Sequence, residues 1–124
     1  AAFTHRNPKG SRFSDGSYGV YYAARELETA IAETVFHFEA FARDSGDAPR
    51  VQDMRVLVGR IDAELEDASK LPQPQRGRIL DRASYQASRP WAAALREAGS
   101  GGIVYPSVRR AGGECVGIFR ARLV

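Results

Sequence analysis

The chain has 124 residues, of which 44% are hydrophobic and 27% charged. These proportions are those of one globular domain and exclude a disordered or fibrous chain. The formal net charge is +3 and the sequence pI is about 9.4, but the arginines are scattered among acidic residues, which argues against a nucleic-acid-binding surface. We therefore expect a single compact domain over residues 1–124 that binds no nucleic acid.

The chain has one cysteine, Cys115, so neither an intramolecular disulfide nor a cysteine-based metal cluster can form. No apolar stretch is long enough to span a bilayer, and no basic start precedes an apolar run, so we expect a cytoplasmic protein without a membrane segment. The histidines, His5 and His37, and the acidic residues lack metal-ligand spacing, which predicts no metal site. Because the chain begins without a methionine, we expect that an upstream segment has been removed.

The first third of the chain is expected to pass from loop to strand. Residues 1–18 are rich in Gly, Pro, Ser and Asn, which predicts a loop with at most one short extended piece and an irregular segment over residues 1–10. The apolar and aromatic run Val20–Ala24 predicts a buried strand that contains Tyr22.

From Glu26 to about Ala42, apolar residues recur at spacings of three and four, which predicts an amphipathic helix. The apolar stripe comprises Leu27, Ala30, Ile31, Val35, Phe38 and Phe41. Glu33 lies near this stripe, so we expect its carboxylate to point inward at the rim of the core. An inward carboxylate requires a partner or a function.

The remainder of the chain predicts a second helix and further strands. The alternating pattern of Arg50–Asp62 predicts a strand, and Leu65–Arg78 is expected to be a connection with at most a short helical turn. Ser84–Ala98 predicts a helix, and Ile103–Tyr105 and Cys115–Leu123 predict closing strands. The sum is an α+β fold with a small mixed β-sheet and about two main helices.

Four side chains near the ends of these elements are candidates for a site. Arg12 lies in a polar loop, where a guanidinium either forks onto phosphate oxygens or is simply solvated. Tyr22 either stacks its ring on a ligand or is a tyrosine of the core. Glu33 either stabilises a developing positive charge or is a residue at the edge of the surface. Ser107 has no histidine placed beside it by spacing, so its hydroxyl is expected to hydrogen-bond substrate or to stabilise a turn.

Four segments of the chain, taken in order, resemble the RES domain family, which is named for an Arg, a Glu and a Ser. These segments are Ser11–Gly16, Gly19–Ala24, Glu28–Thr34 and Gly102–Arg109. The resemblance runs from about Ser11 to the end of the chain. It implies a fold similar to that of ADP-ribosyltransferases.

The same resemblance implies a bacterial toxin of a toxin–antitoxin pair, which consumes NAD⁺ by hydrolysis, by phosphorolysis or by transfer of its ADP-ribose to a protein. By this similarity Arg12, Glu33 and Ser107 match the three naming residues, and Tyr22 matches the tyrosine that accompanies them in the NAD pocket. The family often carries another pocket arginine upstream, and here Arg6 is the residue available for that role. The implied partners are NAD⁺ as substrate, a cognate antitoxin and, for transfer, a host protein.

The chemistry of the four side chains agrees with this resemblance. Nicotinamide leaves as a neutral group from a cationic ring, so a protein must mainly grip the pyrophosphate, orient the ring and stabilise an oxocarbenium-like state. Arg12 is expected to bind phosphate and Tyr22 to pack on the nicotinamide end. Glu33 is expected to hold the ribose hydroxyls and the developing charge, and Ser107 to fix the nicotinamide or the ribose. The alternatives are a mono-ADP-ribosyltransferase that modifies a specific host protein and a catalytically inert RES-like binding module.

Overall fold

The computed structural model describes residues 9–46 and 54–120 of the chain. Its elements, in chain order, are β1 (Tyr21–Ala24), α1 (Leu27–Ser45), β2 (Glu66–Asp67), the 3₁₀ turn η1 (Ala68–Lys70), α2 (Gln75–Ile79), α3 (Ser88–Glu97), β3 (Gly102–Pro106) and β4 (Glu114–Ile118). The two main helices are α1, with 19 residues, and α3, with 10. Over the described ranges, no helix combines the length and the apolarity needed to cross a bilayer.

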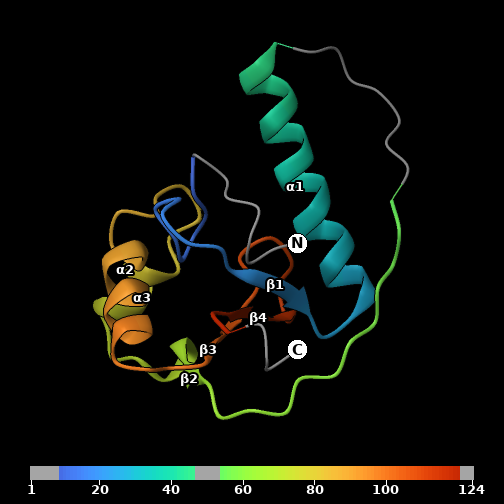
Figure 1. Cartoon of the computed structure of the whole chain (residues 1–124). Coiled ribbons are helices and arrows are strands. Elements are labelled where there is room, and N and C mark those ends of the chain that lie inside the picture. Colours follow the sequence, from blue (N-terminus) through green and yellow to red (C-terminus); the bar gives the residue numbers. More distant parts are fainter. Residues whose placement is uncertain (1–8, 47–53, 121–124) are drawn as a thin grey trace.

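The four strands form one mixed sheet in the order β1-β4-β3-β2. Strand β4 pairs antiparallel with both β1 and β3, whereas β2 runs parallel to β3. In Figure 1, α2 and α3 lie together on one side of the molecule, and α1 extends away from the sheet on the other. The predicted α+β fold with a small mixed sheet and two main helices is therefore confirmed.

The core is centred on Phe13, whose side chain is fully buried. Its ring meets Tyr105 edge-on with a centroid distance of 5.0 Å, lies 6.2 Å from Trp91 and stacks on Tyr22 at 6.3 Å. Aromatic contacts of this kind contribute to stability beyond the area that they bury. Because Phe13 directly follows Arg12, they also fix the loop that carries this arginine.

Gly117 gives the aromatic rings the space to approach β4. It lies opposite Tyr22 in the β1–β4 register. A Cβ at this position would lie 3.2 Å from Phe13 and 3.3 Å from both Tyr22 and Val20. Any larger residue here would push the rings away from the strand.

Most predicted elements lie where the sequence places them, with bounds shifted by a few residues. The strand predicted at Val20–Ala24 is β1, and the helix predicted from Glu26 is α1, which continues to Ser45. Helix α3 begins at Ser88 and carries Pro90 in its first turn, where the missing N–H leaves no helical hydrogen bond unmade. The closing strands are β3 and β4, although β4 ends at Ile118 within the described residues.

The prediction of a strand at Arg50–Asp62 is wrong for residues 54–62, which form no regular structure. Residues 50–53 lie outside the described ranges. Residues 54–62 run along the outside of the molecule, away from the sheet, as Figure 1 shows. The alternating pattern is present, but a strand also needs a partner. The neighbour of β3 is instead β2, which has only two residues and lies in the predicted connection.

The apolar stripe predicted for α1 does not face the core throughout. Leu27, Ile31 and Val35 are each about half exposed, whereas Thr29 is fully buried. A Cβ on Gly113 would lie 2.5 Å from the Thr29 hydroxyl, so α1 rests directly on the backbone of the turn between β3 and β4. Glu33, one helical turn after Thr29, is thereby directed toward the same turn.

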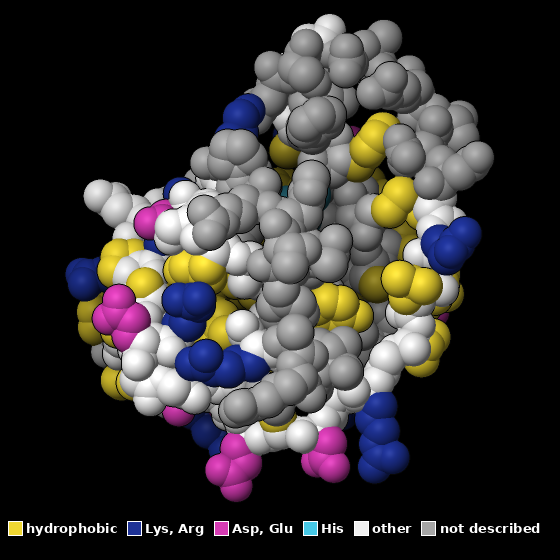
Figure 2. All heavy atoms as spheres, viewed as in Figure 1, with side chains coloured by type: hydrophobic (Ala, Val, Ile, Leu, Met, Phe, Trp, Pro, Cys, Tyr) yellow, Lys and Arg dark blue, Asp and Glu magenta, His cyan; other side chains and the backbone are white. Residues whose placement is uncertain are grey.

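Hydrophobic side chains consequently lie on the outer surface of the molecule. Among the described residues, the exposed large apolar side chains outside α1 are Met54, Val56, Leu57 and Val58, together with the partly exposed Tyr22 of β1. Figure 2 shows hydrophobic side chains at the surface along the edge where residues 54–58 run.

Candidate active site

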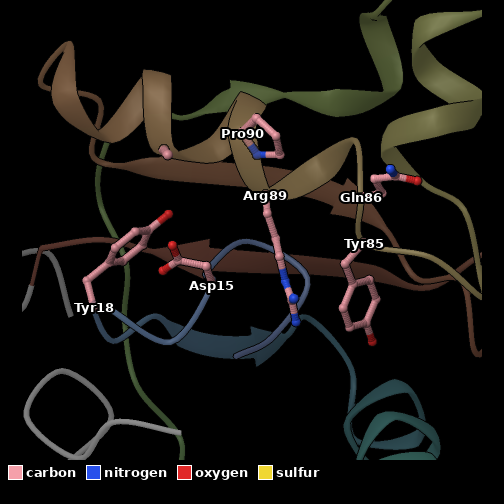
Figure 3. A pocket seen from close by; sticks show the side chains of 7 residues that line it. Asp15, Tyr18, Tyr85, Gln86, Arg89 and Pro90 are labelled. Atoms are coloured by element: carbon pink, nitrogen blue, oxygen red, sulfur yellow. The ribbon is translucent and has the colours of Figure 1, made fainter. Parts of the chain in front are cut away.

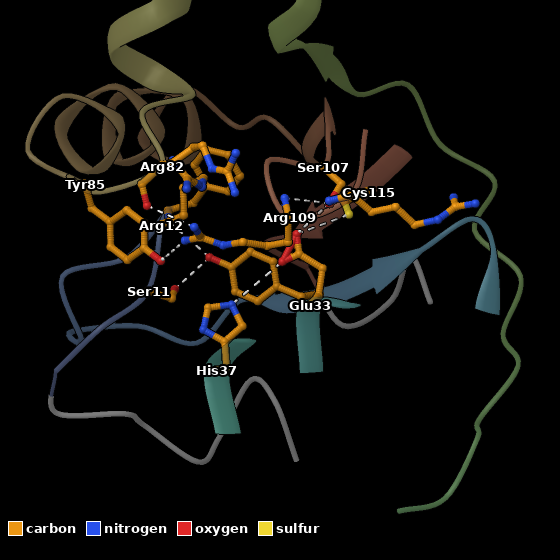
Figure 4. Close-up of polar contacts among 12 residues, drawn as sticks. Ser11, Arg12, Glu33, His37, Arg82, Tyr85, Ser107, Arg109 and Cys115 are labelled. Atoms are coloured by element: carbon orange, nitrogen blue, oxygen red, sulfur yellow. Dashed lines mark hydrogen bonds and ion pairs between the residues drawn. The ribbon is translucent and has the colours of Figure 1, made fainter. Parts of the chain in front are cut away.

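Glu33 of α1 is held by the strands that close the sheet. Its Oε1 accepts a hydrogen bond from the hydroxyl of Ser107 at 3.1 Å and a longer one from the thiol of Cys115 at 3.8 Å. Its Oε2 lies 3.9 Å from Nε2 of His37, one helical turn further along α1. The Glu33 side chain is 22% exposed, so it lies at the rim of the core as the sequence predicts. Figure 4 shows these contacts.

Ser107 directly follows the last residue of β3, and its hydroxyl is fully engaged by protein groups. Its Oγ accepts the backbone N–H of Arg109 at 3.2 Å and that of Arg110 at 3.1 Å. The backbone N–H of Ser107 donates to the carbonyl of Gly113 at 2.8 Å. A hydroxyl has one proton and two acceptor positions, so the single proton is committed to Glu33.

The guanidinium of Arg12 is buried beside this pair, with 6% of the residue exposed. Its Nη1 donates to the carbonyls of Ile79 at 3.2 Å and Asp81 at 2.7 Å, and its Cζ lies 4.7 Å from the ring centroid of Tyr85. Its Nη2 is buried and has no hydrogen-bond acceptor among the described residues. Burial lowers the pKa of Arg12, and the charge of Arg109 lowers it further, but a guanidinium remains protonated at neutral pH.

Arg109 brings a second guanidinium to the same region. Its Nη1 donates to the carbonyl of Arg82 at 3.0 Å, and its Nη2 lies 3.5 Å from the hydroxyl of Tyr85. Its Cζ lies 3.4 Å from the ring centroid of Phe36, a cation–π contact. Its Nε is buried without an acceptor in the part of the chain that the structure describes.

Tyr22 supports the loop that carries Arg12. Its hydroxyl lies 2.6 Å from Oγ of Ser11 and accepts the backbone N–H of Phe13 at 3.0 Å. Burial of this hydroxyl raises the pKa of Tyr22 to about 12. The residue as a whole is 37% exposed, although its ring packs on Phe13.

The two groups that flank Glu33, Cys115 and His37, are both uncharged near pH 7. Burial, and then the charge of Glu33, raise the pKa of the Cys115 thiol to about 11, so this thiol is a hydrogen-bond donor and a poor nucleophile at neutral pH. The pKa of His37 is lowered, first by partial burial and then by the charges of Arg109 and Arg12, while Glu33 opposes this shift. A neutral imidazole beside Glu33 is therefore favoured near pH 7.

A sequence model of the RES domain matches residues 1–124. The chain belongs to the RES domain family. A curated relative, "Uncharacterized protein y4oC" of Sinorhizobium fredii (strain NBRC 101917 / NGR234), is 28% identical over 120 residues, which cover 97% of this chain and 48% of the relative. This RES domain thus spans about half the length of the curated relative that it matches.

In this RES domain, the four residues that the sequence assigns to the site lie in one region. Ser107 bonds Glu33 directly, and Arg12 interacts electrostatically with both Glu33 and Tyr22. Their roles toward a ligand stay predictions. Arg6, the further candidate, lies outside the described residues.

The sequence does not assign Arg109 and Tyr85 to the site. Arg109 lies two residues after Ser107, and this spacing is the signal that points to it. Ser84-Tyr85, just before α3, belongs to the stretch that resembles the RES family, but the sequence does not link Tyr85 to Arg12, which it contacts only through the tertiary fold. Across the described ranges, no group of three or more His, Cys, Asp or Glu side chains is arranged to hold a metal ion.

An open hollow of about 290 Å³ lies next to this cluster. It is lined by Asp15, Tyr18, Tyr85, Gln86, Arg89, Pro90 and Ala93, most of which Figure 3 labels. The guanidinium of Arg89 lies 5.3 Å from the Tyr85 ring centroid and donates to the backbone carbonyls of Ser11 and Lys9. Asp15 accepts hydrogen bonds from Ser17. Because its charged groups are engaged in this way, the hollow is a weaker candidate for binding an anion than the cluster around Arg12.

Proposed function

We propose that this RES domain binds NAD⁺ as a substrate and cleaves the bond between nicotinamide and ribose, as the toxin component of a toxin–antitoxin system. The observation that carries this proposal is a carboxylate, Glu33, held by Ser107 close to the buried guanidinium of Arg12. Membership of the RES family, which is associated with NAD-cleaving toxins, supports it.

The reaction suits a site with one carboxylate. When the bond breaks, its electron pair leaves with nicotinamide, which becomes neutral, and positive charge develops on the ribose. A carboxylate placed near that carbon stabilises the transition state more than the ground state. In this proposal Glu33 supplies the negative charge, and nicotinamide needs no protonation in order to leave.

The contacts of Ser107 favour a positioning role for this residue. Its proton is given to Oε1 of Glu33, and its two acceptor positions are filled by backbone N–H groups. Ser107 therefore acts through Glu33, fixing one carboxylate oxygen so that Oε2 is left to meet the ribose. Cys115, which contacts the same Oε1, supports this orientation.

Arg12 and Tyr22 would serve in binding. The uncompensated guanidinium of Arg12 suits a phosphate oxygen of NAD⁺, because an arginine binds phosphate through directed, charge-assisted hydrogen bonds. Tyr22 is partly exposed, and in this proposal the nicotinamide end packs on its ring while the hydroxyl stays bonded to the Arg12 loop.

The test measures nicotinamide released from NAD⁺ by the purified chain without antitoxin. We expect Glu33→Gln to lower the rate by roughly 10²- to 10³-fold, as loss of a charge-stabilising group does, and Ser107→Ala to lower it by about 10-fold at little change in KM. Glu39→Gln, an exposed substitution on the same helix, is the matched control. Equal release by the wild type and Glu33→Gln would refute the proposal.

The same reaction run with NAD⁺ labelled in its ADP-ribose moiety identifies the acceptor. Label appearing on a discrete protein of a cell lysate indicates transfer, whereas NAD⁺ loss without protein labelling indicates hydrolysis or phosphorolysis. Adding inorganic phosphate separates the last two, because phosphorolysis alone depends on it.

A further inference from the structure

The outer face of α1 carries a partly exposed apolar stripe. Leu27, Ile31 and Val35 recur every four residues, and each is about half exposed. At 3.6 residues per turn, the three side chains share one face of the helix, which points away from Thr29 and its contact with Gly113. Apolar side chains that gather on a surface in this way mark an interaction site.

A second apolar surface lies on residues 54–58. Met54, Val56, Leu57 and Val58 are all exposed. Their pattern suits a strand, but the segment forms none, and the place beside β3 is taken by β2. Figure 1 shows the segment on the outside of the molecule, and Figure 2 shows hydrophobic side chains at the surface there. The segment thus presents strand-like apolar side chains to solvent.

The two surfaces carry opposite charges. The charged residues within 54–60 are Arg55 and Arg60, and both are exposed. On α1 the exposed acids Glu28 and Glu39 lie beside the apolar stripe, and together with it they occupy an arc of about 120° around the helix. In the part of the chain that the structure describes, none of these four residues forms an ion pair. The cationic segment and the anionic stripe are therefore complementary.

The lengths of the two surfaces also match. Residues 54–58 span about 13 Å when extended, and the stripe from Leu27 to Val35 covers about 12 Å along α1. Contact of the segment with its own copy would instead bring Arg55 and Arg60 of two chains together. Contact between two α1 stripes would likewise bring acids together, so like charges disfavour both of these arrangements.

We infer that this chain forms a weak symmetric dimer, in which residues 54–60 of each copy dock on the outer face of α1 of the other. A two-fold arrangement makes this contact twice and closes the assembly. Because both surfaces are small, we expect a dissociation constant on the order of 10–100 µM. At about 1 µM the chain is then a monomer with both surfaces exposed. The dimer does not depend on NAD⁺ cleavage, because neither surface includes a residue of the candidate active site.

The test is sedimentation equilibrium of the whole chain from about 1 µM to about 500 µM. The mean mass of the wild type should rise from one chain of 13.6 kDa toward two. The arginine variant, Arg55→Glu with Arg60→Glu, and the α1 variant, Glu28→Arg with Glu39→Arg, each place like charges on the two surfaces. Each should therefore self-associate at least about 10-fold more weakly. An equal mixture of the two variants restores opposite charges at both contacts and should associate within about threefold of the wild type.

Two further variants separate net charge and apolar contact from position. Lys70→Glu with Arg78→Glu changes the net charge as the arginine variant does, but these exposed residues lie in η1 and α2, outside both surfaces. This control should leave the dissociation constant within about twofold of the wild type. Leu57→Ser removes an apolar side chain from the docking segment and should weaken association about 10-fold.

Four results would overturn the dimer as described. A wild-type chain that stays monomeric at about 500 µM would reject it, whether or not any variant folds, and would leave both surfaces to another protein. Undiminished association of Leu57→Ser would exclude the segment from the contact. Undiminished association of the α1 variant would place the two segments against each other, and that of the arginine variant would place the two α1 stripes together.

Discussion

Two regions of this molecule reverse the usual distribution of polar and apolar side chains. Around Glu33, the polar residues Arg12, Thr29 and Ser107 are buried. On the opposite face of α1 and along residues 54–58, large apolar side chains are exposed, with Val58 at 94%. The comparison shows that α1 is oriented by what its polar face contacts, since Thr29 meets the turn before β4 and Glu33 meets Ser107.

This difference has an energetic consequence. A buried polar group stabilises the fold only while its partners remain, and removing one partner leaves the other unpaired in a dry environment. An exposed apolar side chain has lost little contact with water, so its removal costs little. Substitutions in the two regions should therefore differ strongly in their effects on stability.

The largest expected effect on stability is that of Arg12→Met. Methionine fills much of the same space but cannot donate to the carbonyls of Ile79 and Asp81. We expect the free energy of unfolding to fall by about 2–4 kcal/mol, measured by urea denaturation. A loss below about 1 kcal/mol would mean that these carbonyls find other donors and that the buried region is less constrained than its contacts indicate.

A second effect, intermediate in size, is expected at alkaline pH. Burial raises the pKa of Tyr22 from 10.0 to about 12 and that of Cys115 from 9.0 to about 11, so the folded state favours their protonated forms. Their contribution to stability is complete below the unfolded-state pKa values and is lost as pH rises through about 11 and about 12. The unfolding free energy, followed across this range, should decline less steeply in Tyr22→Phe, and an equally steep decline would contradict the assignment.

The smallest expected effect is that of Leu57→Ser in the exposed region. Leu57 is 77% exposed and lies in a segment without regular structure. We expect the free energy of unfolding to change by less than about 0.5 kcal/mol, in the same urea experiment. A loss above about 1 kcal/mol would show that residues 54–58 are packed against another surface in solution and would remove the contrast between the two regions.

The elements of this fold are largely predictable from local pattern, because their residues carry the helical and strand periodicities without help from the rest of the chain. The strand prediction failed at residues 54–62 for a physical reason. Alternation makes a segment suitable for a sheet, but pairing depends on which strand reaches the edge of β3, and that edge is taken by β2. The prediction that the apolar stripe of α1 faces the core fails for a related reason. The hydrophobic pattern does not reveal that Thr29 of α1 packs closely against Gly113.

The candidate site is less accessible to sequence reasoning than the fold. The positions of Arg12, Glu33 and Ser107 follow from motifs, but their convergence depends on contacts between residues about 70 positions apart, such as that of Ser107 with Glu33. The assignment of Arg109 to the site could have been predicted, because it belongs to the same motif as Ser107. The carbonyls after α2 could not be assigned, since backbone acceptors carry no sequence signal. The pair Ser84-Tyr85 shares in the resemblance to the RES family, but its sequence position does not reveal the contacts of Tyr85 with Arg12 and Arg109.

Neighbouring positions 12 and 13 serve different parts of the protein. The ring of Phe13 belongs to the interior, while the guanidinium of Arg12 lies with the candidate ligand-binding groups. The phosphate binding that we propose for Arg12 and the packing of the hydrophobic core thus depend on two adjacent residues. If the proposed nucleotide binding holds, loss of the core packing around Phe13 should abolish binding and folding in the same transition.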